Sequence, residues 1–350
     1  MRLKDLTKHE GSVEIQCHNI PDADTIASAF AVYKYLKNSN HDTRIIYSGE
    51  QKITKPNLRL MIDRLSIPIE YVEDMPNIDT LLLVDCQYGG TNVKRFSADN
   101  IYVIDHHIES RQPVLPNIIS LINNQLGSCS TIIWNMLNEE QFNFAAHPDV
   151  STALYYGLFT DTSSLTEVSH PLDRDMLDDL NLKSDKFIIN ELKHNNVTPS
   201  EMKIIGAAIS TYLHNPDTRY TILRADECDP TILAIIGDMA MQMQDSGVCI
   251  VYNSSTSGLR VSVRSSLRDV NAGEFAEFIA NGGGHVQKAG GFISADTVLE
   301  SGLSASEYLE KRIQEYFDAY DVIDAKKYNL DLLQNKYKKK ENTSWLYAVN

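Results

Sequence analysis

The chain has 350 residues, which is long enough for two domains of ordinary size, each with its own core. Its formal net charge is -15 at pH 7, and proteins that hold long nucleic acids by their phosphates usually carry a basic face, so a short phosphate compound fits this chain better than a long polymer. The apolar runs are too short to span a membrane, the first residues contain no apolar stretch of signal-peptide length, and the five cysteines lie far apart, so we expect a cytoplasmic protein without disulfides.

Residues 13 to about 165 alternate between predicted strands and helices. We expect strands at 13–17, 45–47, 80–84 and 101–104, and helices at 25–36, 58–65, 127–137 and 150–159. The strands at 80–84 and 101–104 are apolar throughout, as parallel strands are when both of their faces are buried. This pattern predicts a doubly wound α/β domain with a parallel sheet, whose ligands gather at the carboxyl ends of the strands.

Four short segments carry acids and histidines, and three of them directly follow predicted strands. They read His18-Asn19-Ile20-Pro21-Asp22-Ala23-Asp24, Val84-Asp85, Asp105-His106-His107 and Thr160-Asp161-Thr162. Together they offer more oxygen and imidazole ligands than one metal ion needs, and two divalent ions that share a carboxylate are common in enzymes that attack phosphate esters. Taken singly, Asp24 and Asp161 are equally well explained as helix caps.

The doublet His106-His107 predicts two different roles, because neighbouring side chains point apart. One histidine would be a metal ligand and the other would face the substrate. A ligand set of carboxylates and imidazoles suits manganese or magnesium better than a thiolate-bound zinc ion. The sequence therefore predicts a centre for two divalent ions at one edge of the sheet.

Beyond residue 172 the composition changes. We interpret 173–202, which is polar, charged and helix-prone, as a helical linker between a catalytic domain (1–172) and a second α/β domain (203–320). Strands at 220–224, 248–252 and 258–264 and a helix at 272–280 are expected in the second domain. Residues 321–350 form a tail, whose Lys338-Lys339-Lys340 run is either a solvated surface or a contact for a partner or nucleic acid.

Two features of the second domain favour phosphate or nucleotide binding. Arg264 and Ser265, at the end of a predicted strand, supply a cation and a hydroxyl. Gly282, Gly283 and Gly284 precede His285 and remove side chains where a backbone must approach a ligand or a tight neighbour. A simple stop of the preceding helix is the structural alternative for the glycines.

In order and spacing, the four segments resemble the motifs of the DHH phosphoesterase superfamily, which is named for Asp105-His106-His107. Residues 269–292 resemble its DHH-associated C-terminal domain. Within the superfamily the chain is most similar to the compact nanoRNases, which also act as pAp phosphatases, and to relatives that cleave linear or cyclic dinucleotides. It departs from the family pattern at Ile20, where asparagine is more usual, and at Ala23, where glycine is.

The resemblance implies a role for each residue. His18, Asp22 and Asp85 would hold one manganese ion, and Asp24, Asp85, His106 and Asp161 the second, with Asp85 bridging and magnesium as the alternative metal. Asp105 would orient a histidine ring, and His107 would bind the scissile phosphate or protonate the leaving oxygen. Arg264, Ser265, Gly282, Gly283, Gly284 and His285 would hold the substrate's phosphate or terminal nucleotide from the other side of a cleft between the domains.

The expected function is the manganese-dependent hydrolysis of short oligonucleotides, dinucleotides or pAp by hydroxide generated between two ions. The protein could act in this way as a homodimer. The alternatives are a cyclic-dinucleotide phosphodiesterase, a family II pyrophosphatase or exopolyphosphatase, and a nucleotide-binding regulator without catalysis. The second domain lacks the Ser-Arg-Lys cluster of those pyrophosphatases, which favours a nucleotide substrate.

Overall fold

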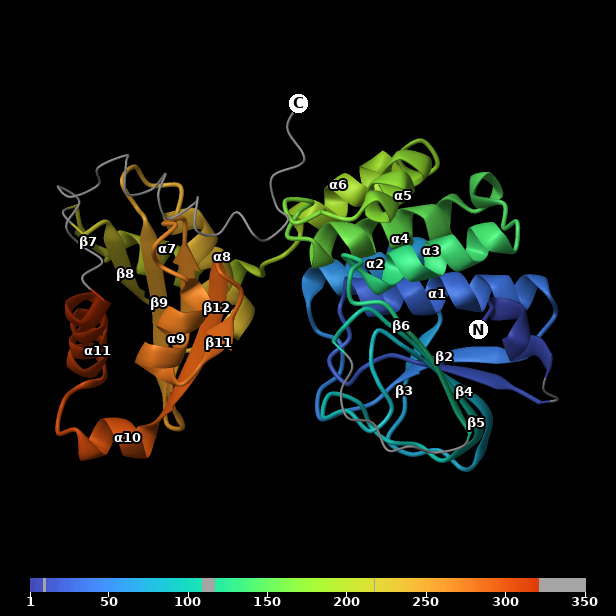
Figure 1. Ribbon diagram of the computed structural model, residues 1–350, viewed down its shortest axis with the longest axis horizontal. Helices are drawn as coiled ribbons and strands as arrows, with labels where there is room; N and C mark the ends of the chain where they lie inside the picture. Colours follow the sequence, from blue (N-terminus) through green and yellow to red (C-terminus); the bar gives the residue numbers. More distant parts are fainter. Residues whose placement is uncertain (9–10, 109–116, 217, 321–350) are drawn as a thin grey trace, which may run out of the picture. The chain divides into compact units, whose positions relative to one another are not determined.

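The computed structural model describes residues 1–8, 11–108, 117–216 and 218–320, and Figure 1 shows how its helices and strands are arranged. The chain divides into two compact units, Met1–Asn196 and Val197–Asn350. Within the predicted linker, α5 (Pro171–Asn181) and α6 (Lys186–His194) pack onto the first unit. Met176, Leu180 and Leu192 of these helices are fully buried in its core, so the helices belong to that unit rather than to a separate connection.

A six-stranded parallel sheet forms the centre of the N-terminal unit. The strand order is β3-β2-β1-β4-β5-β6, and every neighbouring pair is parallel. The strands are β1 (Val13–Gln16), β2 (Thr43–Tyr47), β3 (Ile69–Tyr71), β4 (Ile78–Val84), β5 (Ala98–Asp105) and β6 (Ile118–Ile122). The predicted α/β architecture with a parallel sheet is confirmed.

The helices of this unit bury one face of the sheet, as Figure 1 shows. They are η1 (Leu3–Lys8), α1 (Ala23–Asn38), α2 (Pro56–Leu65), α3 (Cys129–Glu139), η2 (Phe144–Ala146), α4 (Pro148–Asp161), α5 and α6. Leu82 and Val84 of β4 face this helical layer, whereas Leu81 and Leu83 face a smaller apolar cluster. Among the described residues, that smaller cluster is covered by the segment that contains Tyr88 and Phe96 rather than by helices.

The register of the sheet places the predicted ligands at one edge. Gln16 of β1 pairs with Leu83 of β4, and Val84 pairs with Ile104 of β5. The residues that follow these three strands therefore emerge together at their carboxyl ends. Since β1 lies between β2 and β4, the chain leaves β1 and β4 in opposite directions, which opens the crevice where ligands bind in such sheets.

The C-terminal unit is a second, smaller α/β domain, as predicted. Its strands lie in the order β11-β12-β10-β9-β8-β7. Among the strand pairs that the structure describes, β8 and β9 are parallel and the other neighbours are antiparallel. They are β7 (Leu213–Asn215), β8 (Tyr220–Arg224), β9 (Val248–Ser255), β10 (Gly258–Ser265), β11 (Gly283–Gly284) and β12 (Lys288–Ser294).

Helices cover both faces of this second sheet. They are α7 (Pro199–Ser210), α8 (Pro230–Ala240), α9 (Ala272–Ala280), α10 (Ala295–Glu300) and α11 (Ala305–Tyr320). Apolar residues of α9 and α11 pack against one face, and those of α7 and α8 pack on β8 and β9 on the other. In the part of the chain that the structure describes, none of the helices is both long and apolar enough to cross a membrane. The predicted tail with Lys338 lies outside the described residues.

Candidate metal centre

The loop that follows β1 brings His18 and two aspartates into the first turn of α1. Asp22, rather than Asp24, is the N-cap: its Oδ1 accepts hydrogen bonds from the backbone N–H groups of Asp24 and Thr25, both at 3.0 Å. This corrects the capping role considered for Asp24. The second oxygen of Asp22 lies 3.7 Å from His18 Nε2, so one carboxylate both starts the helix and faces the site.

Asp24 is buried and is held by the start of another helix. Its two oxygens accept hydrogen bonds from the backbone N–H groups of Cys129 (2.7 Å) and Ser130 (2.9 Å), in the first turn of α3. Gly157 of α4 permits this arrangement, because a Cβ atom there would lie 2.3 Å from Ser130 Oγ and 2.9 Å from Asp24 Oδ1. The glycine of the fourth motif therefore leaves space for the acid of the first.

Asp85 occupies the middle of the site. It directly follows β4 with a φ of +59°, a conformation that costs free energy for a residue with a side chain and that clusters at functional sites. Its side chain is 2% exposed, with Oδ2 3.7 Å from His18 Nε2 and Oδ1 3.4 Å from His106 Nε2. One carboxylate thus lies between the two histidines.

Asp161 is the last residue of α4, where it cannot cap a helix N-terminus. A carboxylate at this end lies against the negative pole of the helix dipole, which is unfavourable unless a cation is close. Its Oδ2 lies 2.9 Å from His106 Nε2. The Nδ1 of His106 lies 3.1 Å from the carbonyl oxygen of Leu126, and since a carbonyl only accepts, Nδ1 carries a proton and Nε2 is the ring nitrogen that faces the acids.

We use the name metal centre for six residues that form two neighbouring triads. Potential ligand atoms lie within 4.8 Å of one another in the triads His18–Asp22–Asp85 and Asp24–His106–Asp161, and Asp85 also forms such a group with His106 and His107. Asp85 Oδ1 and His106 Nε2 are buried without a hydrogen-bond partner. Buried orphan atoms of this kind, on carboxylates and an imidazole, fit divalent cations such as Mn²⁺ or Mg²⁺.

The acids of the metal centre repel one another. Burial and the charge of Asp161 raise the pKa of Asp24 to about 7. Burial and the charges of Asp24, Asp22 and Asp161 raise the pKa of Asp85 well above its usual range. Burial lowers the pKa of His106, but Asp161 and Asp24 outweigh it and raise that pKa to about 9. Without a cation, the protein must therefore hold protons among these groups.

His107 is held by a chain of hydrogen bonds that starts outside the predicted motifs. Asp105 Oδ1 accepts from His107 Nδ1 at 2.8 Å, and Asp105 Oδ2 accepts from Gln87 Nε2 at 2.6 Å. The hydrogen bond to Asp105 raises the pKa of His107. Sequence reasoning missed the positioning role of Gln87, although its place two residues after Asp85 is the signal that points to it.

The two histidine rings do not point apart as expected. Their centroids are 4.4 Å apart with the planes tilted by 55°. The cause is local: β5 ends at Asp105 and the chain bends at His107, so the alternation of side chains along a strand no longer applies. The side chain of His107 is 58% exposed, against 12% for His106, so His107 is accessible to solvent whereas His106 is nearly buried.

The predicted substrate residues of the C-terminal unit gather at one end of its sheet. Arg264 pairs with Lys288 across β10 and β12, Ser265 N donates to the carbonyl of Gln287, and His285 N donates to the carbonyl of Lys288. Arg264 is already engaged, because its Nε donates to Asp238 Oδ1 at 2.6 Å and its side chain is 11% exposed. Ser265 is buried and hydrogen-bonds locally with Leu267.

The glycine run has a packing role in this unit. Asn281 ends α9 in the left-handed conformation, and the next residues form β11 against β12. A Cβ atom on Gly282 would lie 2.0 Å from the carbonyl oxygen of Gly290, and one on Gly284 would lie 2.5 Å from that of Lys288. Gly283 meets nothing within 4 Å, and His285 is exposed. Close backbone packing thus explains two of the three glycines.

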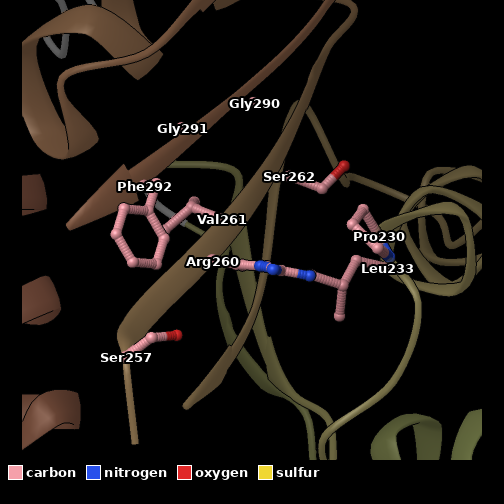
Figure 2. A pocket seen from close by; sticks show the side chains of 9 residues that line it. All are labelled: Pro230, Leu233, Ser257, Arg260, Val261, Ser262, Gly290, Gly291 and Phe292. Atoms are coloured by element: carbon pink, nitrogen blue, oxygen red, sulfur yellow. The ribbon is translucent and has the colours of Figure 1, made fainter. Parts of the chain in front are cut away.

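A pocket of about 600 Å³ in this unit is lined by other residues. Figure 2 shows the Arg260 side chain between Phe292 of β12 and Leu233 of α8, with Ser262 beside them. Arg260 and Phe292 are direct partners across β10 and β12, and Phe292 is 42% exposed. Arg264 and His285 do not line this pocket.

A larger cavity, of about 790 Å³, adjoins the metal centre within the N-terminal unit. We name it the β2–β3 cavity, because the segments that follow β2 and β3 form much of its wall. His18 belongs both to its lining and to the metal centre, and Ile20, Glu50, Tyr71, Thr91 and Lys94 are further lining residues. Sequence reasoning did not identify this cavity, since apart from the start of the first motif its lining comes from segments that carry no motif.

Comparison with known proteins assigns each of the two units to a domain family. Residues 12–158 match the DHH family, N-terminal domain, and residues 217–314 match the DHHA1 domain. An exopolyphosphatase-related protein from Bacteroides fragilis has the same fold, with a TM-score of 0.67 and 17% identity over 91% of this chain and 96% of that one.

Two curated relatives align with most of this chain. An uncharacterized protein from Methanocaldococcus jannaschii is 22% identical over 302 residues, which are 86% of this chain and 61% of that protein. The cyclic-di-AMP phosphodiesterase PdeA of Listeria monocytogenes is 22% identical over 339 residues, 91% of this chain and 49% of that protein. The chain thus spans less than two thirds of the length of either relative. Because its two units match the two domains of one family in chain order, the chain belongs to the DHH phosphoesterase superfamily.

Proposed function

We propose that this protein hydrolyses phosphate esters in short nucleotides, namely dinucleotides, short oligonucleotides or nucleoside bisphosphates such as pAp, with the help of two divalent ions. The observation that carries this proposal is the pair of ligand triads, one of which contains Asp85 while the other lies around His106, 3.4 Å from it. Members of the DHH family are phosphoesterases, which supports the reaction type.

His18, Asp22 and Asp85 would hold one ion, and Asp24, Asp85, His106 and Asp161 the other. Bound divalent ions would neutralise phosphate charge and supply an acidified water near neutral pH. Manganese is our first candidate and magnesium the second, because both prefer oxygen and imidazole ligands.

The residues outside the two triads would act on the substrate. His107, fixed through Nδ1 by Asp105, keeps Nε2 for the scissile phosphate or for a proton on the leaving oxygen. In the C-terminal unit, Arg264, Ser265, the glycines 282–284 and His285 remain candidates for holding a phosphate or terminal nucleotide. Arg264 would have to exchange its Asp238 partner for such a group.

A cyclic-dinucleotide phosphodiesterase is the second candidate. It is favoured by the similarity to the cyclic-di-AMP phosphodiesterase of Listeria monocytogenes, although the chain covers 49% of that protein. A pyrophosphatase or exopolyphosphatase is less well supported, because the β2–β3 cavity beside the metal centre offers few cations.

The proposal is tested by incubating the purified protein and Mn²⁺ with pApA, pAp, cyclic di-AMP and pyrophosphate and separating the products by chromatography. We expect hydrolysis of the nucleotide substrates and its loss in Asp85→Ala, with weaker Mn²⁺ binding by calorimetry. Asp63→Asn, an exposed acid on α2, is the matched control. Full turnover by Asp85→Ala would contradict the shared-carboxylate assignment.

A further inference from the structure

The β2–β3 cavity opens where the carboxyl ends of β1, β2 and β3 meet. Gln16 pairs with Ile46, and Tyr47 pairs with Tyr71, so the residues that follow these strands lie at one edge. Its volume of about 790 Å³ falls within the range of about 300–1,000 Å³ that is usual for small-molecule sites. His18 belongs both to the lining of the cavity and to the metal centre, so the cavity lies beside the place proposed for the phosphate.

The charges of the lining argue against a second phosphate group in the cavity. The lining contains two acids, Glu50 and Glu73, and one lysine, Lys94, and the ammonium of a second lysine, Lys52, lies 5.1 Å from the centroid of the Tyr71 ring. The Lys94 ammonium donates to the backbone carbonyl of Glu73 and lies 5.6 Å from the centroid of the Phe96 ring. Inorganic polyphosphates need several cations or arginine forks, and this lining does not provide them.

The same lining suits a neutral sugar and base. Glu50 is an exposed acid three residues after β2, and a carboxylate there can accept hydrogen bonds from the hydroxyls of a sugar. Gln51, Thr91 and Asn92 add exposed amide and hydroxyl groups. These groups match the donors and acceptors of a nucleoside rather than the uniform negative charge of a phosphate chain.

Two apolar surfaces complete the cavity. Tyr71 is fixed before any ligand arrives, because its hydroxyl donates to the Gly49 carbonyl at 2.7 Å and its ring meets the Tyr47 ring edge-on at 5.3 Å. Ile20, between His18 and Asp22, is 69% exposed and lines the same cavity. An aromatic ring and an aliphatic side chain beside polar groups form a common setting for a nucleobase.

We propose that the β2–β3 cavity binds the nucleoside attached to the phosphate at the metal centre, with Glu50 toward the sugar and with Ile20 and Tyr71 toward the base. This proposal rests on the proposed function, because it assumes that the substrate's phosphate lies at the metal centre. It predicts that pyrophosphate and polyphosphate are poor substrates, because neither contains a nucleoside. It also means that Ile20, where the family more often has asparagine, would contact the base and so affect which substrate is bound.

Adenosine is the probe, since it has no phosphate and tests the cavity apart from metal and catalysis. We expect saturation-transfer NMR on the metal-free full-length protein to detect adenosine binding. The nucleotide pApA should compete for the site, and pyrophosphate should not. Competition by pyrophosphate equal to that by pApA would overturn the proposal.

Two variants locate the binding. Thr91→Trp places a large ring in the cavity from an exposed position and should abolish adenosine binding. Glu50→Gln keeps the shape but removes the charged acceptor, and adenosine affinity should fall about tenfold. Asp63→Asn, outside the cavity, should bind as the parent does. Parental affinity in both cavity variants would overturn the proposal, and circular dichroism shows whether each variant is folded.

Hydrolysis of bis(p-nitrophenyl) phosphate with Mn²⁺ separates this proposal from the proposed function, because that diester contains no nucleoside. Hydrolysis without adenosine binding supports the proposed function and overturns the cavity assignment. Adenosine binding that Thr91→Trp abolishes, without hydrolysis of the diester, pApA, pAp or cyclic di-AMP, supports the cavity assignment and overturns the proposed function.

Discussion

Gln87 donates a 2.6 Å hydrogen bond from Nε2 to Asp105 Oδ2, and this contact fixes the carboxylate whose other oxygen holds His107. All three residues lie at the carboxyl ends of β4 and β5. Gln87 and Asp105 are buried, whereas His107 is exposed. A buried amide therefore positions an exposed imidazole through one carboxylate.

Replacing Gln87 by alanine should lower the rate while the metal content stays near that of the parent. The Asp105 carboxylate would lose a donor, and His107 would lose its fixed orientation. Groups that orient the residues of metal sites typically contribute about 10- to 100-fold to activity, and we expect a loss of this size. Gln314→Ala, an exposed glutamine on α11, is the control, and parental turnover in Gln87→Ala would contradict the positioning role.

That these acids and histidines lie close together could be predicted from sequence, because each stands at an element end that the pattern marks. Apolar runs locate Asp85 and Asp105 after strands, and parallel strands bring their carboxyl ends together whatever the loops do. The N-cap was misplaced by two residues, since Asp22 and Asp24 are equally good caps by type and only the backbone distinguishes them.

Other features of the fold and the site could not be predicted, because they depend on contacts between residues far apart in the sequence. The partner of Arg264 is Asp238, 26 residues away on α8, and the loops that line the β2–β3 cavity carry no periodic signal. The short edge strands β3, β7 and β11 were not predicted, because two or three residues are too few to show alternation.

The two histidines should separate metal binding from catalysis. His106 Nε2 lies 2.9 Å from Asp161 and 3.4 Å from Asp85, so His106→Ala should arrive depleted of metal. His107 Nδ1 is committed to Asp105 at 2.8 Å and lies farther, 3.7 Å, from Asp85, so His107→Ala should keep its metal and lose most of its turnover. The test is to measure the metal content of each variant by mass spectrometry and to compare it with the variant's turnover rate. A metal-depleted His107→Ala would show that both histidines bind the ions.

A methyl group at Gly157 should disturb the fold and the metal centre together. The added Cβ would lie 2.3 Å from Ser130 Oγ and 2.9 Å from Asp24 Oδ1, and Asp24 is held by two backbone N–H groups. Overpacking of this kind costs about 1–3 kcal/mol, so the melting temperature of Gly157→Ala should fall, along with its Mn²⁺ affinity.

Gly206 supplies the matched control for that change. It also lies inside a helix, α7, but a Cβ there meets nothing within 4 Å. Gly206→Ala should stabilise the protein slightly, because alanine is the better helix former by about 1 kcal/mol. If both variants shifted the melting temperature equally, the shift would reflect helix propensity and not the contact with Asp24.

The stability of the metal-free protein should fall as pH rises, while the stabilisation that Mn²⁺ adds should grow. In the metal-free protein the pKa of Asp24 is raised to about 7 and that of His106 to about 9, so the folded state binds more protons than the unfolded state. Stability then falls as pH rises, for Asp24 between its ordinary value of 3.8 and about 7, and for His106 between 6.5 and about 9. Mn²⁺ competes with these protons, so the stabilisation it gives should increase over the same interval.

Calorimetric melting at about pH 6 and about pH 8, with EDTA and with Mn²⁺, measures both effects. We expect the melting temperature with EDTA to be lower at the higher pH, and the increase caused by Mn²⁺ to be larger there. Asp161→Asn removes a charge that raises both pKa values, so it should weaken the pH dependence of the EDTA samples. A Mn²⁺ effect of equal size at both pH values would mean that the ions do not displace protons from the metal centre, and the acids would then have to be ionised before the metal arrives.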